Sequence, residues 1–421
     1  MFKFQKNLLI TTVMLIMVMF TSSMASAAGQ VLTQGKWAPA TRTAMQKFID
    51  TYGTKSSNYN AAKKPYVVFD WDNTSIMNDT EEALFMYQIQ NLVFKLKPEE
   101  FGKIVTKNVP QGSFNKEYNN MAGQAVTLEA VNNDLIRDYT FIYNNYAGMQ
   151  GKMSLEDIQK TDQFMDFRAK MWYIYQAIDD KYTSKISYTW VLYFFKNMTT
   201  DEVSALTEKS NDYNLGQAIR KETWLSPDTL PGEAGVVGVS HTTGLRLTEE
   251  IGDLMSTLRS NGFDVYVCTA SLEDVVAVFA TNPKYGYNVA RENVIGMQLE
   301  KINNVYQDSY KKGLVPTGEH GKTLGIQRVV ADKRGYGPIM VAGDSSGDYN
   351  MMTEFPDTKR VLLVNRLKSG SFGKLCAEAA ATMGNPNAKF VLQGRNENLG
   401  LWNPSEEVIK LGKNTGALLA K

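Results

Sequence analysis

The chain has 421 residues, of which 43% are hydrophobic, so it can bury either one large core or a core with an inserted domain. Its 45 basic and 44 acidic residues give a net charge of +1, which excludes bulk electrostatic binding to nucleic acid or to an anionic membrane. We therefore expect a folded, soluble protein with no nucleic-acid partner.

The first segment, residues 1–27, has the three-part layout of a secretory signal peptide. Lys3 and Lys6 precede an apolar run from Leu8 to Phe20, and Ala25-Ser26-Ala27 forms an A-x-A cleavage site. The apolar run is short for a membrane span, so cleavage is favoured over an uncleaved anchor. We predict an exported protein, periplasmic or extracellular, with no stable membrane insertion after cleavage.

The chain contains two cysteines, Cys268 and Cys376, and its size does not require disulfides for stability. Cys268 lies inside an apolar run that is typical of an interior strand. Two buried thiols are therefore favoured, although an oxidising compartment would permit a disulfide between them.

Residues 28–65 are predicted to form an N-terminal helical arm. Met45, Phe48 and Ile49 have the spacing of one helix face within the segment Thr41 to Tyr52. A polar loop then leads into the first strongly apolar run of the chain.

Four short apolar runs predict the strands of a buried parallel sheet: Tyr66–Phe69, Val265–Cys268, Ile339–Ala342 and Val361–Val364. Helical stretches separate them, which favours an α/β, doubly wound fold. Each run ends at polar residues of reactive types. Open α/β sheets bind their ligands at the carboxyl ends of the strands, so the site is expected there.

More than 150 residues with helical patterning separate the first two runs, which is too long for an ordinary connection. We predict a large inserted α-helical cap domain at residues 79–236 and a core made of residues 66–78 and 237–421. The insertion is rich in aromatic side chains, and at helical spacing these indicate a packed core more often than a ligand site. Among them are Trp172, Tyr173, Tyr175 and Trp190.

The segment Asp70-Trp71-Asp72-Asn73-Thr74 directly follows the first predicted strand. Two carboxylates two residues apart can face the same crevice if the backbone turns at the strand end. One can then attack phosphorus while the other exchanges protons with the leaving oxygen and the attacking water. A solvated acidic turn or a helix cap would give the same pattern.

The segment from Gly343 to Asp348, Gly-Asp-Ser-Ser-Gly-Asp, follows the third predicted strand. Its acids can supply the hard oxygen ligands that Mg²⁺ prefers, and a simple Gly/Ser/Asp turn explains the composition equally well. Thr269 and Lys322 can hold phosphoryl oxygens and offset negative charge. Nearby alternatives to these two are Ser271, Lys311 and Lys312.

Together and in this order, the four elements resemble the signature of the haloacid dehalogenase-like (HAD) phosphatases, over about residues 66 to 365. That signature is D-x-D-x-T, a strand-end Thr or Ser, a Lys, and G-D-x-x-x-D. The resemblance implies that Asp70 forms an aspartyl-phosphate and that Asp72 protonates the leaving alcohol, then activates water. Asp72 favours a phosphatase, because the dehalogenases and P-type ATPases of the superfamily lack an aspartate there.

The same resemblance implies a Mg²⁺ cofactor held by the Asp70 carboxylate, the Asp72 backbone carbonyl and Asp344. Asp348 would support the metal-bound waters or Lys322. Thr269 and Lys322 complete the predicted catalytic set. The residues predicted to bind substrate are Asn73, Thr74, Ser271 and Glu82.

A closer resemblance is to the exported bacterial phosphorylcholine phosphatases of this superfamily. It rests on the segment from Asp70 to Ser75 with the acids that follow it, on Thr269-Ala270-Ser271, and on the segment from Gln393 to Asn398. In that group, an acid in the position of Glu82 helps to hold the trimethylammonium head. Trp71 departs from the more usual Met, and Thr269 stands where that group has Ser.

Acids and aromatic faces together form quaternary-ammonium sites, which is a separate physical reason to expect a cationic substrate. Glu82 is equally explained as a plain surface acid on the helix after Asp79. His241 and His320 support no metal or nucleophile cluster, and we expect both to be structural or solvated.

The predicted function is hydrolysis of a small phosphomonoester, with phosphorylcholine as the candidate substrate. A first alternative is a broad-specificity acid phosphatase or phosphotransferase on the same scaffold. A second is an envelope protein that binds a ligand without turnover. The sequence carries no signal for an oligomeric state.

Overall fold

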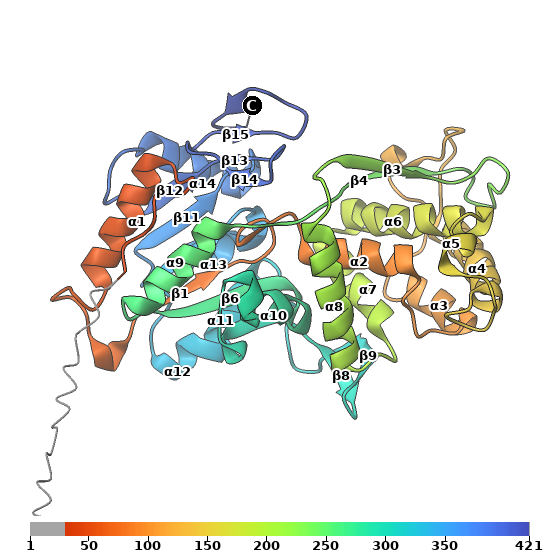
Figure 1. The fold of residues 1–421 in the computed structure, drawn as a ribbon, viewed down its shortest axis with the longest axis horizontal. Helices are drawn as coiled ribbons and strands as arrows, with labels where there is room; N and C mark the ends of the chain where they lie inside the picture. The colour runs from red at the N-terminus through yellow and green to blue at the C-terminus, as the bar shows by residue number, and fades with distance from the viewer. Residues whose placement is uncertain (1–29, 421) are drawn as a thin grey trace, which may run out of the picture.

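The computed structural model describes residues 30–420, which form two bodies lying side by side (Figure 1). One body contains the large β-sheet and its covering helices, and the other is mainly helical. The predicted signal peptide, residues 1–27, lies outside the described residues. Within the described range, no helix combines the length and the apolar character that a bilayer crossing requires.

The main sheet has six strands, all parallel, in the order β12-β11-β10-β1-β6-β7. The predicted doubly wound α/β fold is confirmed, with the additional edge strands β7 and β12. The strands are β1 (Tyr66–Phe69), β6 (Asp264–Leu272), β7 (Val294–Met297), β10 (Met340–Gly343), β11 (Arg360–Val364) and β12 (Phe390–Gln393).

Helices cover both faces of this sheet because its central strand, β1, is apolar on both faces. Val67 and Phe69 pack in one cluster with α1, α9 and α10, and Tyr66 and Val68 pack in another with α11, α13 and α14. The helices on the two faces are α1 (Pro39–Tyr52), α9 (Glu249–Ser260) and α10 (Glu273–Thr281), then α11 (His320–Ile326), α13 (Tyr349–Thr353) and α14 (Gly370–Ala381).

Strand β6 is longer than the predicted run Val265–Cys268, because it continues to Leu272. Its pairing with β7 shifts register between Cys268 and Leu272. Thr269 therefore lies inside the strand, and Ser271 lies near its end. This overrun carries polar side chains beyond the last residue of β6 that pairs with β1, where a bulge can re-aim them.

Both cysteines are buried and free. Cys268 lies in β6 and Cys376 lies in α14. The prediction of two buried thiols is confirmed, and burial raises the pKa of each to about 12.

The helical body is formed by seven helices between β2 and β3, together with a long β-hairpin. Trp172, Tyr173, Tyr175 and Trp190 are all buried in its core, as predicted for most of its aromatic residues. The helices are α2 (Thr80–Asn91), α3 (Pro98–Val105), α4 (Leu128–Asn145), α5 (Leu155–Ile158), α6 (Asp162–Tyr182), α7 (Ser184–Leu192) and α8 (Thr200–Leu215).

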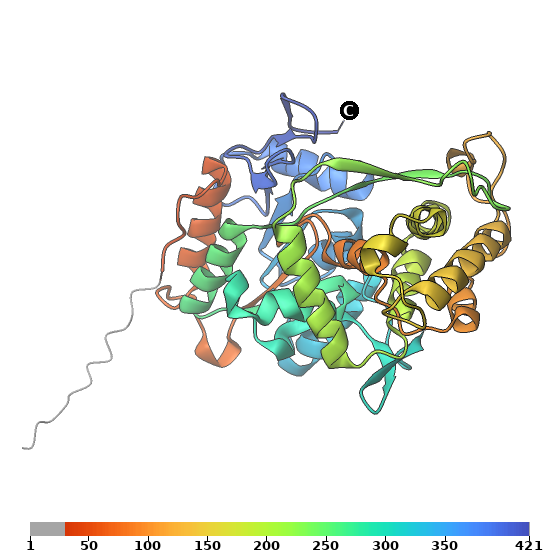
Figure 2. The same cartoon turned by 45° about the vertical axis from the view of Figure 1, so that its right-hand side comes forward.

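The hairpin of β3 (Lys221–Leu225) and β4 (Gly238–Thr242) runs along the helical body beside α6 and returns to the sheet body (Figure 2). It spans the boundary that we predicted between residues 236 and 237. A second hairpin, β8 (Leu299–Ile302) with β9 (Val305–Tyr310), leaves the sheet body and packs against the helical one. The two bodies therefore share apolar contacts as well as the connections near β2 (Ile76–Met77) and β5 (Arg246–Leu247).

The start of α1 contacts β12 at the edge of the main sheet. Gln393, the last residue of β12, accepts the backbone N–H of Ala38 at 2.8 Å, and Thr41 donates to the carbonyl of Leu392 at 2.6 Å. A small sheet follows β12 directly, so its first strand lies near the carboxyl ends of the main strands. Its strands are β13 (Arg395–Asn396), β14 (Leu401–Trp402), β15 (Val408–Ile409) and β16 (Gly416–Ala417).

Candidate active site

The loop after β1 brings Asp70 to the carboxyl end of the sheet. The N–H of Asp70 still donates to the carbonyl of Ala342 in β10, at 2.9 Å, and the chain then leaves the sheet. Asn73 has a φ of 61°, a left-handed conformation that asparagine tolerates better than most residues. The loop turns there and returns Thr74 to the side chain of Asp70.

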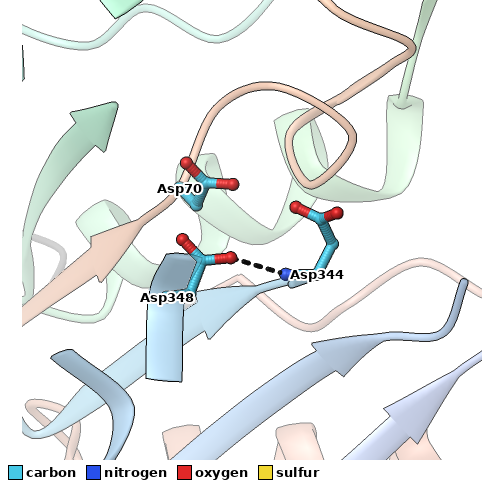
Figure 3. Close-up of side chains that lie close together, drawn as sticks. All are labelled: Asp70, Asp344 and Asp348. Carbon is cyan, nitrogen blue, oxygen red and sulfur yellow. Dashed lines mark hydrogen bonds between the residues drawn. The ribbon is translucent and has the colours of Figure 1, made fainter. Parts of the chain in front are cut away.

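Asp70, Asp344 and Asp348 form a cluster in which one carboxylate oxygen from each residue lies within 4.8 Å of the other two (Figure 3). Asp70 follows β1 and Asp344 follows β10, so neighbouring parallel strands place them together. The Oδ2 of Asp348 accepts the backbone N–H groups of Asp344 and Ser345, at 3.0 and 3.1 Å. The sheet and one tight turn therefore fix all three carboxylates.

Lys322 joins two members of this cluster from α11. Its Nζ lies 2.5 Å from Asp70 Oδ1 and 2.6 Å from Asp348 Oδ1, and all three side chains are buried. Burial and the negative charge of Asp348 raise the pKa of Asp70 well above its ordinary value, against the opposing charge of Lys322. One ammonium therefore does not fully offset the acids around it.

The cluster fits a hard divalent cation. The Thr74 hydroxyl lies 3.0 Å from both Asp70 Oδ2 and Asp344 Oδ1, but its single proton can satisfy only one of them. Asp70 Oδ2 and Asp344 Oδ1 therefore both face the Thr74 hydroxyl, which can donate a hydrogen bond to only one of them. Oxygen ligands of this kind suit Mg²⁺, and Asp70 and Asp344 are the side chains best placed to hold it.

Asp72 belongs to a second group of polar side chains. Its Oδ1 accepts the N–H of Thr80, at 2.7 Å, at the start of α2. Its Oδ2 accepts the hydroxyls of Ser271, at 2.7 Å, and Thr269, at 3.3 Å, from the overrun of β6. Burial raises the pKa of Asp72 in spite of these bonds, which favours its protonated form.

A cavity of about 540 Å³ lies over both groups, between the sheet body and the helical body. Its floor includes Asp70, Asp72 and Lys322, and its opposite wall includes Asp179 and Tyr188. A substrate in this cavity would have a phosphoryl group at the strand ends and its remainder against the helical body.

A second chamber of about 270 Å³ adjoins this cavity, because Asn73, Asp79 and Arg366 line both. Glu82 and Trp172 lie in its wall. The Oε1 of Glu82 accepts the hydroxyl of Tyr175 at 3.1 Å, and burial raises the pKa of Glu82 to about 7. Glu82 is therefore not a plain surface acid.

The two histidines lie outside both catalytic groups. His241 is buried against Trp224, with ring centroids 4.3 Å apart, and burial lowers its pKa to about 4. His320 is exposed and pairs with Glu354 at 2.9 Å. His320 is solvated, as predicted, whereas His241 is buried and also lines the second chamber.

No protein-family model matches the chain. A solved structure of a functionally unknown protein from Anaerococcus prevotii is 33% identical in sequence and superposes with a TM-score of 0.84, covering 91% of this chain and 99% of that one. A phosphorylcholine phosphatase from Pseudomonas aeruginosa is 26% identical over 239 residues, which are 56% of this chain. The match spans half the length of that relative.

The partial match to a phosphorylcholine phosphatase agrees with the resemblance to the HAD phosphatases found in the sequence. Of the predicted HAD site residues, the structure brings five into direct contact and places three others in the second polar group around Asp72. Asn73 and Glu82 reach the same cavities, whereas the alternatives Lys311 and Lys312 line neither. The five in contact are Asp70, Thr74, Lys322, Asp344 and Asp348.

Two arginines of this site, the half-buried Arg366 and the buried Arg395, were not predicted. Arg366 pairs with Asp344 Oδ2 at 2.5 Å, and this pairing lowers the pKa of Asp344 against the opposing effect of burial. Arg395 donates to Asn73 Oδ1 at 3.3 Å and pairs with Glu397 at 2.9 Å. The available signals were the position of Arg366 just after the fourth strand and that of Arg395 in the segment from Gln393 to Asn398.

Proposed function

We propose that the protein is a Mg²⁺-dependent phosphomonoesterase that uses Asp70 as its nucleophile. The observation that carries this proposal is the contact of the buried Asp70 carboxylate with Lys322, inside the three-carboxylate cluster. A negatively charged carboxylate can approach a phosphoryl group only where nearby positive charge offsets the repulsion between the two anions.

In the first step, a carboxylate oxygen of Asp70 attacks phosphorus, and the bond from phosphorus to the leaving oxygen breaks. Protonated Asp72 gives its proton to that oxygen, so the product leaves as an alcohol. In the second step, ionised Asp72 takes a proton from water while the water oxygen attacks phosphorus. The aspartyl-phosphate bond then breaks, which releases inorganic phosphate and restores Asp70.

Mg²⁺, when bound by Asp70, Asp344 and the backbone carbonyl of Asp72, would supply further positive charge to the phosphoryl oxygens. Lys322 holds Asp70 in place and offsets its charge. The hydroxyls of Thr269 and Ser271 orient the Asp72 carboxyl group between the two steps.

For the substrate, we propose a phosphomonoester whose alcohol part carries a positive charge, with phosphorylcholine as the candidate. The wall opposite the nucleophile is acidic, because Asp79, Asp179 and Asp180 line the main cavity and Glu82 lines the adjoining chamber. Trp172 adds an aromatic face beside Glu82. Acids with an aromatic face favour a quaternary ammonium group. The partial match to a phosphorylcholine phosphatase supports the same choice.

The test is a panel of phosphorylated small molecules assayed with Mg²⁺ on the purified protein. We expect release of phosphate, with phosphorylcholine turned over at least about 10-fold better, in kcat/KM, than its uncharged analogue 3,3-dimethylbutyl phosphate. Equal turnover of the two would overturn the choline proposal. Transfer of phosphate to added glycerol would favour a phosphotransferase, and binding without release would favour a non-catalytic protein.

We also propose that the protein is exported. The support is the layout of residues 1–27 in the sequence, with Ala25-Ser26-Ala27 as the cleavage site. The mass of the mature protein, isolated from the cell envelope or the medium, checks this. A mature chain that begins at Ala28 is the expected result, and an intact Met1 would contradict it.

A further inference from the structure

Glu81 is a buried carboxyl group beside Asp72 that the proposed mechanism does not use. It lies in the first turn of α2 and is 6% exposed, whereas its neighbour Glu82 reaches the second chamber. Burying a carboxyl group is costly unless it makes hydrogen bonds, so its partners indicate its role.

The partner of Glu81 is the backbone at the end of β6. Its Oε2 accepts the N–H of Leu272 at 2.8 Å, and Leu272 is the last residue of that strand. Its Oε1 is buried and has no hydrogen-bond partner among the described residues. The bond from the Leu272 N–H therefore links α2 to β6.

These two elements hold the Asp72 carboxyl group from opposite sides. Thr80, at the start of α2, donates its N–H to Asp72 Oδ1 at 2.7 Å. Ser271, near the end of β6, donates its hydroxyl to Asp72 Oδ2, also at 2.7 Å. Glu81 directly follows Thr80, and Leu272 directly follows Ser271. The bond from Leu272 to Glu81 thus sets the spacing between the two donors that hold Asp72.

The end of β6 needs such a contact because its pairing is irregular there. The register against β7 shifts between Cys268 and Leu272. The N–H of Ser271 donates to the hydroxyl of Thr269 at 3.0 Å, within the same strand. The two hydroxyls that point at Asp72 therefore lie on a stretch of irregular pairing.

We propose that Glu81 is a positioning residue, which orients Asp72 by holding the end of β6 against the first turn of α2. It contacts neither the Asp70 cluster nor the cavity above it. This inference rests on the proposed phosphatase function, so its test includes one measurement that does not require activity.

The test compares three substitutions of Glu81 with a matched control. Glu81→Ala removes the acceptor, Glu81→Asp draws it back by one methylene, and Glu81→Gln keeps an oxygen that can accept the Leu272 N–H. The control is Glu250→Ala. Glu250 is also buried, at 8% exposure, and it accepts a backbone N–H from the distant residue Lys36 at 2.7 Å, outside both cavities.

We expect Glu81→Ala and Glu81→Asp to lower kcat by about 10- to 100-fold, because a small displacement of an acid/base group has an effect of that order. Their KM should stay within about twofold, since Glu81 does not touch substrate. Glu81→Gln should keep kcat within about threefold of wild type, and Glu250→Ala within about twofold. Unchanged kcat in the Ala variant, or an equal loss in the Gln variant, would overturn the inference.

Hydrogen exchange of the peptide covering residues 268–273 provides the independent measurement. Exchange at this peptide should be faster in Glu81→Ala and Glu81→Asp than in wild type, and unchanged in Glu81→Gln. If the wild-type protein released no phosphate, the proposed function would be wrong. Hydrogen exchange would still test the bond from the Leu272 N–H to Glu81. Wild-type exchange rates in both the Ala and Asp variants would refute the positioning role.

Discussion

The two walls of the central cavity are built differently. On the sheet side, Asp70, Asp344 and Asp348 each follow or adjoin a strand, and the atoms of each are held by two or more polar contacts. On the helical side, Asp179 and Glu82 lie on α6 and α2 and face the cavities, and neither has a basic partner in direct contact among the side chains that the structure describes. The sheet side is fixed for chemistry, and the helical side leaves charge available for a ligand.

This contrast explains why burial has different consequences on the two sides. In the Asp70 cluster, the network of Lys322 and backbone N–H groups holds several charges in a rigid arrangement. Around Glu82, burial raises the pKa to about 7, against the opposing effects of the Tyr175 hydroxyl and the charge of Arg366. A bound cation would therefore find an acid whose charge is weakly compensated by the protein itself.

The largest expected effect comes from the sheet side, with Asp70→Asn. This substitution keeps the volume of the side chain but removes the nucleophilic carboxylate, so we expect kcat to fall by at least about 10⁴-fold. Acid-quenched reactions with labelled substrate should contain no covalent phosphoenzyme. Circular dichroism should match wild type, and a phosphoenzyme formed by this variant would remove Asp70 from its role.

The next effect is that of metal removal. Chelation should lower phosphate release by more than about 100-fold, because the charge that offsets the phosphoryl oxygens is lost. At 100 times its Kd, Mg²⁺ should stabilise the fold by about 2.7 kcal/mol, measured as a rise in Tm. In the Asp344→Asn variant, Mg²⁺ should raise Tm much less than in wild type. Full activity after thorough chelation would contradict the metal assignment.

A smaller effect is expected on the helical side, from Glu82→Gln. The neutral amide should raise KM for phosphorylcholine by roughly 10-fold, equivalent to about 1.4 kcal/mol, and leave kcat nearly unchanged. KM for 3,3-dimethylbutyl phosphate, measured in parallel, should not rise. If both substrates were affected equally, Glu82 would not distinguish charge, and the contrast between the two walls would be wrong.

The smallest effect is a pH dependence that belongs to the helical side alone. With a pKa of about 7, Glu82 is mostly protonated at pH 6 and mostly ionised at pH 8. Only the ionised form attracts a cation, so kcat/KM for phosphorylcholine should rise with pH across this range, by up to about 10-fold. The ratio of kcat/KM for phosphorylcholine to kcat/KM for the uncharged analogue, taken at each pH, separates this change from the titration of Asp72. A flat ratio would refute it.

The sheet side was largely predictable because a parallel sheet places sequence-distant strand ends side by side. The four apolar runs identified the inner strands, and the acids after two of them proved to be neighbours. The edge strands β7 and β12 were missed. β7 contains Gly296 in its interior, so its apolar pattern is weaker than those of the predicted inner runs.

The partners of the site residues were less predictable, because they depend on how separate elements pack. Nothing in the spacing of Arg366 indicates that its guanidinium reaches back to Asp344. Likewise, the pair Glu81-Glu82 reads as two equivalent acids in the sequence. Only the orientation of α2 against β6 directs one into the interior and the other to a chamber.

The pairing of β1 also determines the order in which the molecule can be built during synthesis. Val67 lies opposite Val265 in β6 and Met340 in β10, so β1 leaves the ribosome about 200 residues before its first partner. The helical body lies between them and can fold on its own local contacts in the meantime. The carboxylate cluster can be assembled only once Asp348 has emerged, so the chain between β2 and β3 is synthesised well before the cluster is complete.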